Sequence, residues 1–258
     1  MSVPFRTRVR AGERLVGTFL KTPSAIIAEL LALSPLDCIV IDGEHAPFGR
    51  AELDLCLMAL HGAQKPALVR VASRDPAHMA AALDGGAAGV VVPHIASASE
   101  ARACVRACHY GPGGRGFAAS PRGAGYTSRT VREQRDHAAA STTIIGQIED
   151  ASALDTLDEI LGVPGLDGIL IGRMDLAVSL GAQSPSDPAV VAAVETIVDA
   201  SRSAGVAVGM FVPNATEVPR WLERGVTLFF LASDQQFVIE GARALAATVH
   251  DARPGDRA

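Results

Sequence analysis

A short apolar run followed by a helical segment recurs eight times along this chain. The runs lie at residues 15–20, 39–41, 66–71, 89–94, 142–150, 166–171, 206–211 and 226–231. The second run, Ile39-Val40-Ile41, is continuously apolar, as in parallel strands buried on both faces. Regular alternation of strands and helices predicts a parallel sheet with helices outside it. Because eight such units close a TIM barrel, we predict a single (β/α)8 barrel.

The length of the chain and one missing motif favour this barrel over a doubly wound open sheet. The chain has 258 residues, and about 250 residues is usual for one barrel. No GxGxxG motif follows the first strand, which argues against a dinucleotide-binding sheet. We therefore expect one domain over residues 1–258, with flexible tails at 1–12 and 252–258.

Composition narrows the classes of function. The chain is 48% hydrophobic and 20% charged, so it can fill a large core, and its net charge of −5 comes without a basic cluster suited to nucleic acid. It has no run of about 18 apolar residues and no apolar signal core. We expect a cytoplasmic protein with no membrane or nucleic-acid partner. The four cysteines form no CxxC pair and are expected to be small buried residues.

Polar side chains gather where the predicted strands end. In a barrel, the carboxyl ends of the strands carry the chemistry. Those ends supply Lys21, Asp42, Glu44, His45, Arg70, His94, Gln147, Glu149 and Asp175.

The types of these residues suggest chemistry on an enolate. Glu149 and Asp175 follow adjacent strands, and two such carboxylates are a usual way to hold Mg²⁺ or Mn²⁺. His45 is a candidate base, and Arg70 can stabilise an oxyanion. Structural alternatives remain open: the two carboxylates could be helix caps, Arg70 could form an ion pair between strands, and His94 could simply pack.

Four motifs resemble those of the HpcH/HpaI aldolases: DGEHAP at 42–47, VR at 69–70, QIE at 147–149 and GRMDL at 172–176. The resemblance runs from Gly17 to about Leu245. It implies a metal-dependent (class II) pyruvate aldolase on a TIM barrel that uses Mg²⁺, Mn²⁺ or Co²⁺. It also implies a small oxo acid and an aldehyde as substrates, and a homo-oligomer, a trimer or hexamer in which the last helix is exchanged between neighbours.

The resemblance assigns roles residue by residue. Glu149 and Asp175 match the metal ligands, His45 the acid/base and Arg70 the residue that stabilises the pyruvate enolate. Gln147 matches a group that contacts the substrate.

Further roles concern the surroundings of these groups. The backbone of Gly172, Arg173 and Met174 matches the site of the pyruvate carboxylate, although Arg173 and Met174 replace a Pro-Ala pair of familiar members. Asp84 matches an aspartate that raises the basicity of the histidine, a role for which position alone favours Asp42. Asp42 and Glu44 are then expected in the second shell around the metal.

Three other functions are kept as alternatives. A Schiff-base aldolase would need Lys21, the one lysine at a strand end. A lyase for CoA thioesters would need a basic groove, to which Arg115 and Arg122 could contribute. A non-catalytic barrel is the last alternative. The glycine-rich loop at 110–126, which holds both arginines, is expected to be functional and to serve its own or a neighbouring site.

Overall fold

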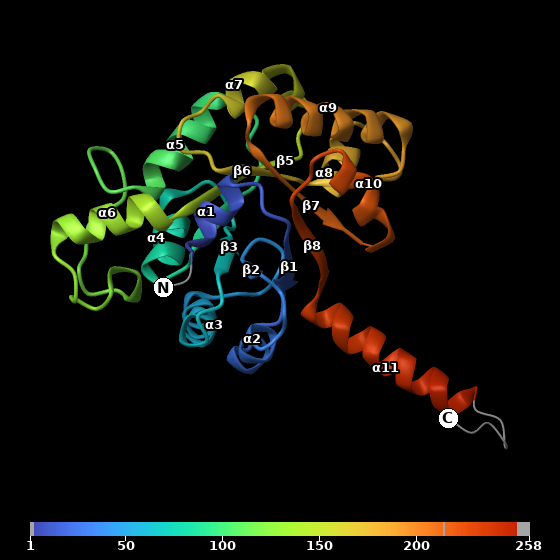
Figure 1. Cartoon of the computed structure of the whole chain (residues 1–258), viewed down its shortest axis with the longest axis horizontal. Coiled ribbons are helices and arrows are strands. Elements are labelled where there is room, and N and C mark those ends of the chain that lie inside the picture. The colour runs from blue at the N-terminus through green and yellow to red at the C-terminus, as the bar shows by residue number, and fades with distance from the viewer. Residues whose placement is uncertain (1–2, 214, 252–258) are drawn as a thin grey trace.

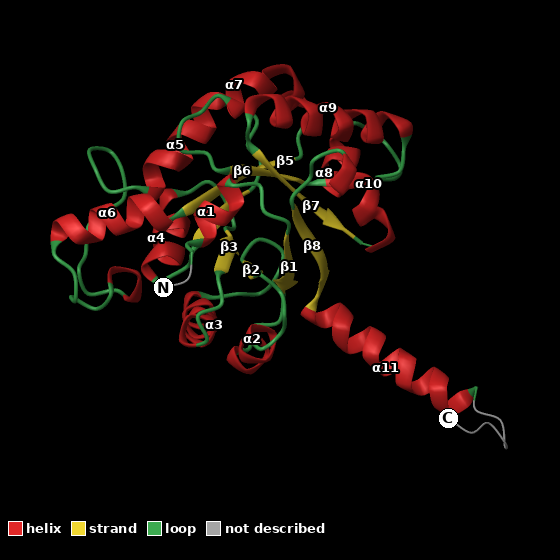
Figure 2. Cartoon of the chain, viewed as in Figure 1, coloured by secondary structure: helices red, strands yellow, loops and turns green. Residues whose placement is uncertain are grey.

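The computed structural model describes residues 3–213 and 215–251. Eight parallel strands form a closed barrel in chain order, which confirms the predicted fold (Figures 1 and 2). The strands are β1 (Leu15–Leu20), β2 (Cys38–Asp42), β3 (Ala67–Arg70), β4 (Gly89–Val92), β5 (Thr143–Ile148), β6 (Gly168–Ile171), β7 (Ala207–Val212) and β8 (Leu228–Ser233).

Most helices follow the strands and lie around the barrel in Figure 2; the first helix precedes the first strand, and the last one projects away from the barrel. The helices are α1 (Phe5–Arg10), α2 (Ala25–Ala32), α3 (Arg50–Gly62), α4 (Pro76–Asp84), α5 (Ala98–Cys108), α6 (Val131–Ser141), α7 (Leu157–Leu161), α8 (Arg173–Ser179), α9 (Pro188–Ala204), α10 (Val218–Glu223) and α11 (Asp234–His250). Short 3-10 turns lie at η1 (Arg122–Ala124), η2 (Ala151–Thr156) and η3 (Ala215–Glu217). The Ser24 side chain caps α2, and Asp75 caps α4 ahead of Pro76, as their sequence positions predict.

The core has an inner and an outer layer because neighbouring strand residues point to opposite faces. Phe19, Val40, Leu68 and Phe230 belong to the buried cluster inside the barrel. A larger cluster joins the outer strand faces to the helices. Strand spacing is tight at Gly89, where a β-carbon would lie 2.2 Å from the carbonyl oxygen of Thr143.

The first helix departs from the expected flexible tail at residues 1–12. Phe5 and Val9 lie one turn apart on α1, and both side chains are buried in the inner cluster. Six residues give too short a periodic pattern to recognise, and their helix is stabilised by this burial. The second predicted tail, 252–258, lies outside the described residues.

The last helix, α11, projects away from the barrel (Figure 1). Large apolar side chains stay exposed along it: Phe237, Val238, Ile239, Leu245 and Val249. At its start, the buried Asp234 carboxylate accepts hydrogen bonds from the Lys21 amide at 2.7 Å and the Thr22 amide at 3.1 Å. The start of α11 is therefore tied to the exit of β1.

Within the described part of the chain, no helix has the length and hydrophobicity required to cross a bilayer.

Candidate active site

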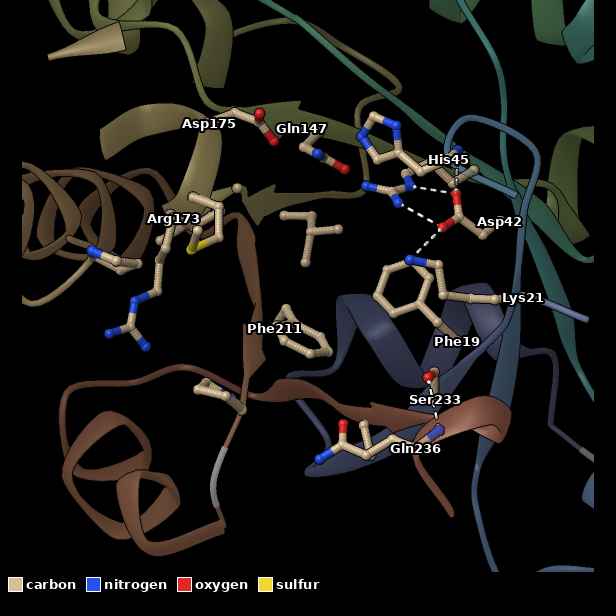
Figure 3. A pocket seen from close by; sticks show the side chains of 18 of the residues that line it. Phe19, Lys21, Asp42, His45, Gln147, Arg173, Asp175, Phe211, Ser233 and Gln236 are labelled. Carbon is tan, nitrogen blue, oxygen red and sulfur yellow. Dashed lines mark hydrogen bonds and ion pairs between the residues drawn. The ribbon is translucent and has the colours of Figure 1, made fainter. Parts of the chain in front are cut away.

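A cavity of about 490 Å³ opens at the carboxyl ends of the strands (Figure 3). Its polar wall includes Lys21, Asp42, His45, Arg70 and Gln147, and the exits of β6, β7 and β8 complete it. Phe19 and Phe211 face each other from β1 and β7 with ring centroids 5.9 Å apart, and both line the cavity. The cavity therefore has a charged side and an aromatic side.

Asp42 and Arg70 form a buried, bidentate ion pair on the charged side. They are partners in the β2–β3 register, and Arg70 donates from Nε at 3.0 Å and from Nη2 at 2.8 Å to the two Asp42 carboxylate oxygens. Burial opposes ionisation of Asp42, but the hydrogen bonds and charge of Arg70 outweigh it and lower the pKa of that carboxyl. Lys21 adds a second cation, with Nζ 3.5 Å from Asp42 Oδ2. The Arg70 guanidinium is thereby held in one orientation.

Asp42 also shapes the turn that carries His45. Its Oδ1 accepts hydrogen bonds from the backbone amides of Glu44 at 3.3 Å and His45 at 3.1 Å. Asp42 thus acts on the main chain of His45. The carboxylate near the His45 ring is that of Glu44, whose Oε2 lies 3.7 Å from Nε2. The His45 side chain is 54% exposed, so it can exchange protons with a bound molecule or with water.

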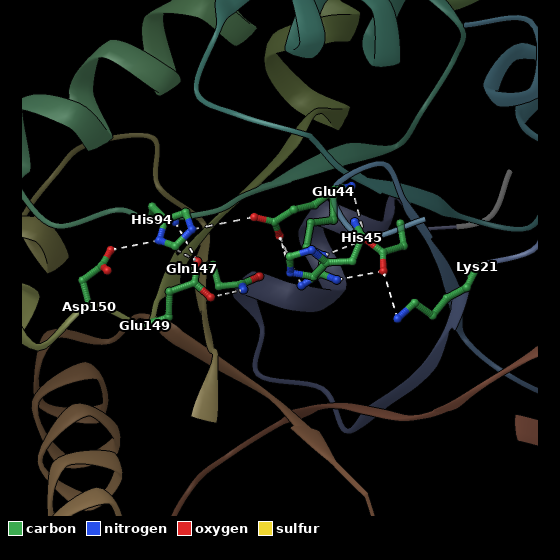
Figure 4. Close-up of polar contacts among 9 residues, drawn as sticks. Lys21, Glu44, His45, His94, Gln147, Glu149 and Asp150 are labelled. Carbon is green, nitrogen blue, oxygen red and sulfur yellow. Dashed lines mark hydrogen bonds and ion pairs between the residues drawn. The ribbon is translucent and has the colours of Figure 1, made fainter. Parts of the chain in front are cut away.

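A group of metal-binding type lies beside Arg70. Glu44, His94 and Glu149 each offer a ligand atom, and these atoms lie within 4.8 Å of one another. The His94 ring contacts both glutamates, with Nε2 3.8 Å from Glu44 Oε1 and Nδ1 3.4 Å from Glu149 Oε1. Figure 4 shows Glu44 beside His94 and Glu149 below it. The buried Oε2 of Glu44 makes no hydrogen bond among the described residues, but it forms an ion pair with Arg70 Nη1 at 3.3 Å. The fit to a metal therefore comes from the donor set itself, because two carboxylates and one imidazole are ligands that a divalent cation accepts.

The pKa values of Glu44 and His94 depend on each other, because each side chain lies near the charge of the other. Burial, reinforced by the charge of Glu149, raises the pKa of Glu44 against the opposing charge of Arg70. For His94, burial disfavours the charged form, but the hydrogen bond to Asp150 at 3.1 Å and the surrounding carboxylates outweigh it and raise its pKa. The carboxylates therefore create a site that favours positive charge.

Glu149 is fixed from two directions. Its Oε1 accepts a hydrogen bond from the His94 amide at 2.9 Å, and its Oε2 accepts one from the Gln147 side-chain amide. A β-carbon at Gly172 would lie 2.5 Å from Glu149 Oε2 and 2.8 Å from Glu149 Cβ. Glycine therefore lets the exit of β6 pass close to this carboxylate.

The first turn of α8 brings Asp175 and Met174 to the cavity wall, and both side chains are exposed. Arg173 is 11% exposed and donates from Nη1 to Glu217 Oε2 at 2.8 Å. The same Glu217 oxygen accepts from the indole nitrogen of the buried Trp221 at 3.3 Å. This contact joins the loop after β6 to the loop after β7.

Residues 15–241 match the family described as HpcH/HpaI aldolase/citrate lyase. The chain belongs to this family. The predicted family membership is therefore confirmed.

Relatives cover nearly the whole length of this HpcH/HpaI family member. It is 35% identical over 249 residues to the 4-hydroxy-2-oxo-heptane-1,7-dioate aldolase of Klebsiella pneumoniae, covering 96% of this chain and 94% of the relative. A family protein from Burkholderia cenocepacia superposes with a TM-score of 0.89 at 32% identity, covering 95% and 98% of the two chains. The citrate synthase SbnG gives a TM-score of 0.86 at 25% identity, covering 97% and 98%.

The predicted site residues of this family member divide into two sets. His45, Arg70, Gln147, Glu149, Asp175, Gly172, Arg173, Met174, Asp42 and Glu44 all lie at the carboxyl end of the barrel or on the exits from its strands. Asp84 lies elsewhere: it ends α4 shortly before β4 begins and pairs with Arg115. Within one chain, Asp84 is therefore at the amino end of the barrel, away from His45.

Two features of the metal-binding group differ from the sequence expectation. The close group joins Glu149 to Glu44 and His94, and Asp175 is outside it. Glu44, expected in the second shell, is a member of this close group. For His94, where packing was one open alternative, the backbone has a φ of +55° and the ring lies among three carboxylates. The available sequence signal was its position just after β4; the orientation of its ring required the structure.

Proposed function

We propose that this protein is a divalent-metal-dependent aldolase that reversibly cleaves a 4-hydroxy-2-oxo acid into pyruvate and an aldehyde. The observation that carries this proposal is the placement of Arg70, locked by Asp42, next to the group formed by Glu44, His94 and Glu149. The similarity to the Klebsiella enzyme supports the reaction class. Other members of the same family are described as citrate lyases, which keeps a CoA-thioester lyase as the second candidate.

The chain's own residues account for the main steps of cleavage. Mg²⁺, Mn²⁺ or Co²⁺ held by Glu149, together with Asp175 or with Glu44 and His94, would supply Lewis-acid polarisation of the oxo acid. His45 takes the proton from the 4-hydroxyl as the bond between C3 and C4 breaks and the aldehyde departs. Arg70 stabilises the negative charge that develops on the C2 oxygen. Protonation at C3 then gives pyruvate.

The substrate-binding roles follow the same geometry. Gln147 and the backbone of Gly172, Arg173 and Met174 border the cavity next to Glu149 and are proposed to hold the oxo-acid end. The aldehyde end then faces Phe19 and Phe211. The Asp42–Arg70 pair makes Asp42 a positioning residue for the oxyanion contact.

The structure disfavours the Schiff-base alternative, and within one chain it does not place the two loop arginines beside the cavity. The Lys21 ammonium is held 3.5 Å from Asp42, whereas a Schiff base requires a free amine. Lys65, the other lysine in the sequence, donates to the carbonyls of Ser34 and Leu36 away from the cavity. Arg115 and Arg122 lie beside Asp84 and Gly85, so they do not form a CoA groove next to this cavity.

Assembly is part of the proposal. We propose a cytoplasmic homo-oligomer, a trimer or hexamer, in which the exposed apolar side chains of α11 are covered by a neighbouring subunit. Asp84 and the 110–126 loop lie together through the Asp84–Arg115 pair. A role for Asp84 at a histidine would therefore require the His45 of a second copy. Light scattering coupled to gel filtration gives the mass directly.

Pyruvate release from 4-hydroxy-2-oxoheptanedioate tests the reaction, with lactate dehydrogenase as the coupling enzyme. We expect loss of activity after exhaustive chelation, recovery with Mg²⁺, Mn²⁺ or Co²⁺, and a large loss in Glu149→Gln. Full activity in the chelated protein would contradict the proposal. Turnover of malyl-CoA or citramalyl-CoA in place of the oxo acid would favour the second candidate, and a borohydride-trapped pyruvate adduct would favour the Schiff-base alternative.

A further inference from the structure

A second cavity of about 400 Å³ lies at the amino end of the barrel. Its wall includes Ala67 at the start of β3, Ala88 just before β4 and Thr142 just before β5. The helices α1 and α6 and the C-terminal ends of α3 and α4 complete it; α1, α4 and α6 are seen near the N-terminus in Figure 1. Because the candidate active site is at the opposite ends of the strands, the two cavities are separate.

The charge of this second cavity has a single sign. Its described lining residues include no aspartate or glutamate. The basic residues and histidines among them are His61, Lys65, Arg115, Arg122, Arg129 and His137. In a chain with a net charge of −5, this concentration of cations is distinctive. A concave, cation-lined wall focuses a positive potential and attracts anions.

Two of the cations have carboxylate partners that lie outside the lining. Arg115 pairs with Asp84 through one terminal nitrogen, and its guanidinium stacks 4.7 Å from the centre of the Tyr110 ring. Arg122 pairs with Asp54 at 2.7 Å. These contacts fix the two guanidinium groups in place beside the cavity.

The other two cations have only neutral partners among the contacts of the described residues. Lys65 Nζ donates to the carbonyls of Ser34 at 2.9 Å and Leu36 at 2.5 Å. Arg129 Nη1 donates to the side-chain oxygen of Gln134 at 3.0 Å. Neither side chain forms an ion pair within 4.0 Å with a carboxylate of the described residues, although the Arg129 charge does act on nearby Glu133.

Arg115 provides an independent indication of a missing partner. Its side chain is only 3% exposed, and its buried Nε has no hydrogen-bond partner among the described residues. Leaving a buried charged donor unpaired is costly, so such groups usually have a partner, a water or an ion. Burial, and to a smaller extent the charge of Arg129, lower the pKa of His137 in the same wall.

We propose that this cavity binds a small, multiply charged oxyanion, such as the phosphate group of a metabolite, through Arg115, Arg129 and Lys65. Arginine suits this role because its planar group can donate two hydrogen bonds to one oxyanion. The anion would connect the 110–126 loop with the segments before β3 and α6. The site is distinct from the proposed aldolase chemistry, so either can be wrong without the other.

Calorimetry tests the site by measuring the affinity of the full-length, metal-stripped protein for inorganic phosphate and, separately, for pyrophosphate. Chloride keeps the ionic strength fixed in both titrations. Arg129→Gln removes one cation without leaving a carboxylate unpaired. Arg132→Gln is the matched control because Arg132 lies three residues further along, in the first turn of α6, and its side chain is 92% exposed. We expect the affinity to fall by about tenfold or more in Arg129→Gln, the value of one charge-assisted hydrogen bond, and to stay unchanged in the control.

A second measurement does not depend on heats of binding. Phosphate should raise the melting temperature of the natural sequence and of Arg132→Gln more than chloride does at equal ionic strength, and this gain should shrink in Arg129→Gln. Equal phosphate affinity in the two variants would place the anion elsewhere and overturn the proposal. A change of sedimentation coefficient in Arg129→Gln without any phosphate binding would also overturn it, because the cationic face would then be a contact between subunits.

Discussion

Replacing Asp42 with asparagine tests the reasoning about the buried ion pair. Asp42 is fully buried, and its carboxylate accepts two hydrogen bonds from Arg70 and two from backbone amides. It also lies 3.5 Å from the Lys21 ammonium. Breaking a buried pair costs about 3–5 kcal/mol, and asparagine keeps one acceptor oxygen, so we expect a loss of about 2–4 kcal/mol. For a chain of this size, that loss lowers the melting temperature by about 4–16 °C.

Urea unfolding of Asp42→Asn at neutral pH, followed by circular dichroism, measures this loss. Asp199→Asn is the control because Asp199 is 60% exposed and pairs with Arg224 at 3.4 Å, so its expected cost is below about 0.5 kcal/mol. An Asp42→Asn protein as stable as the control would refute the reasoning. The aldolase assay on the same variant should show a lower kcat/KM, because Arg70 loses its fixed orientation.

The pH dependence of the same variant gives a second test. The folded pKa of Asp42 is lowered, so its stabilisation is complete above the unfolded value of about 3.9 and is lost as pH falls through the folded pKa. The natural protein should therefore lose more stability than Asp42→Asn when both are taken from pH 5 into this acid range. If both proteins lost the same unfolding free energy over this pH range, the lowered pKa of Asp42 would be contradicted.

Three further outcomes are expected. Gly172→Ala places a methyl carbon 2.5 Å from Glu149 Oε2 and should weaken Mn²⁺ binding, measured by calorimetry, about tenfold. The control Gly181→Ala, on a surface turn, should keep the affinity, and equal affinities in the two variants would argue against Glu149 as a ligand. A double-mutant cycle of Arg173→Met and Glu217→Gln should give a coupling of about 1 kcal/mol, with a change in Trp221 emission in each single variant; strict additivity would exclude the contact between the two loops. Burial and the Arg6 charge lower the pKa of His109, so the neutral ring's contribution to stability is present above about pH 6.5 and is lost as pH falls through the folded pKa. His109→Gln should therefore make the unfolding free energy depend less on pH over this range, and an unchanged pH dependence would contradict the lowered pKa.

Local sequence signals sufficed for most of the fold. Ser24, Asp75 and Pro76 marked helix starts where the structure has them, because capping depends on neighbouring residues alone. The helix α1 was missed because Phe5 and Val9 are stabilised by contacts with strands far along the chain. Burial of this kind is a property of the assembled barrel.

The sequence predicted which residues lie at the site better than it predicted which of them contact one another. Placing polar residues at strand ends identified His45, Arg70 and Glu149. The partnership of Asp42 with Arg70 depends on the β2–β3 register, which the sequence does not specify. The orientation of His94 depends on one backbone angle, and the position of Asp84 on where α4 ends. These details are tertiary, so residue type and order alone could not supply them.

The hydrogen bonds of Asp234 join the outermost part of the molecule to its cavity. One carboxylate at the start of α11 holds the amides of Lys21 and Thr22, and Lys21 in turn faces Asp42. Shortening the chain before residue 234 would therefore release the backbone that carries the cavity's lysine, besides removing a projecting helix. A displacement of α11 would therefore also move the Lys21 backbone and, through Lys21, the part of the cavity wall that holds Asp42.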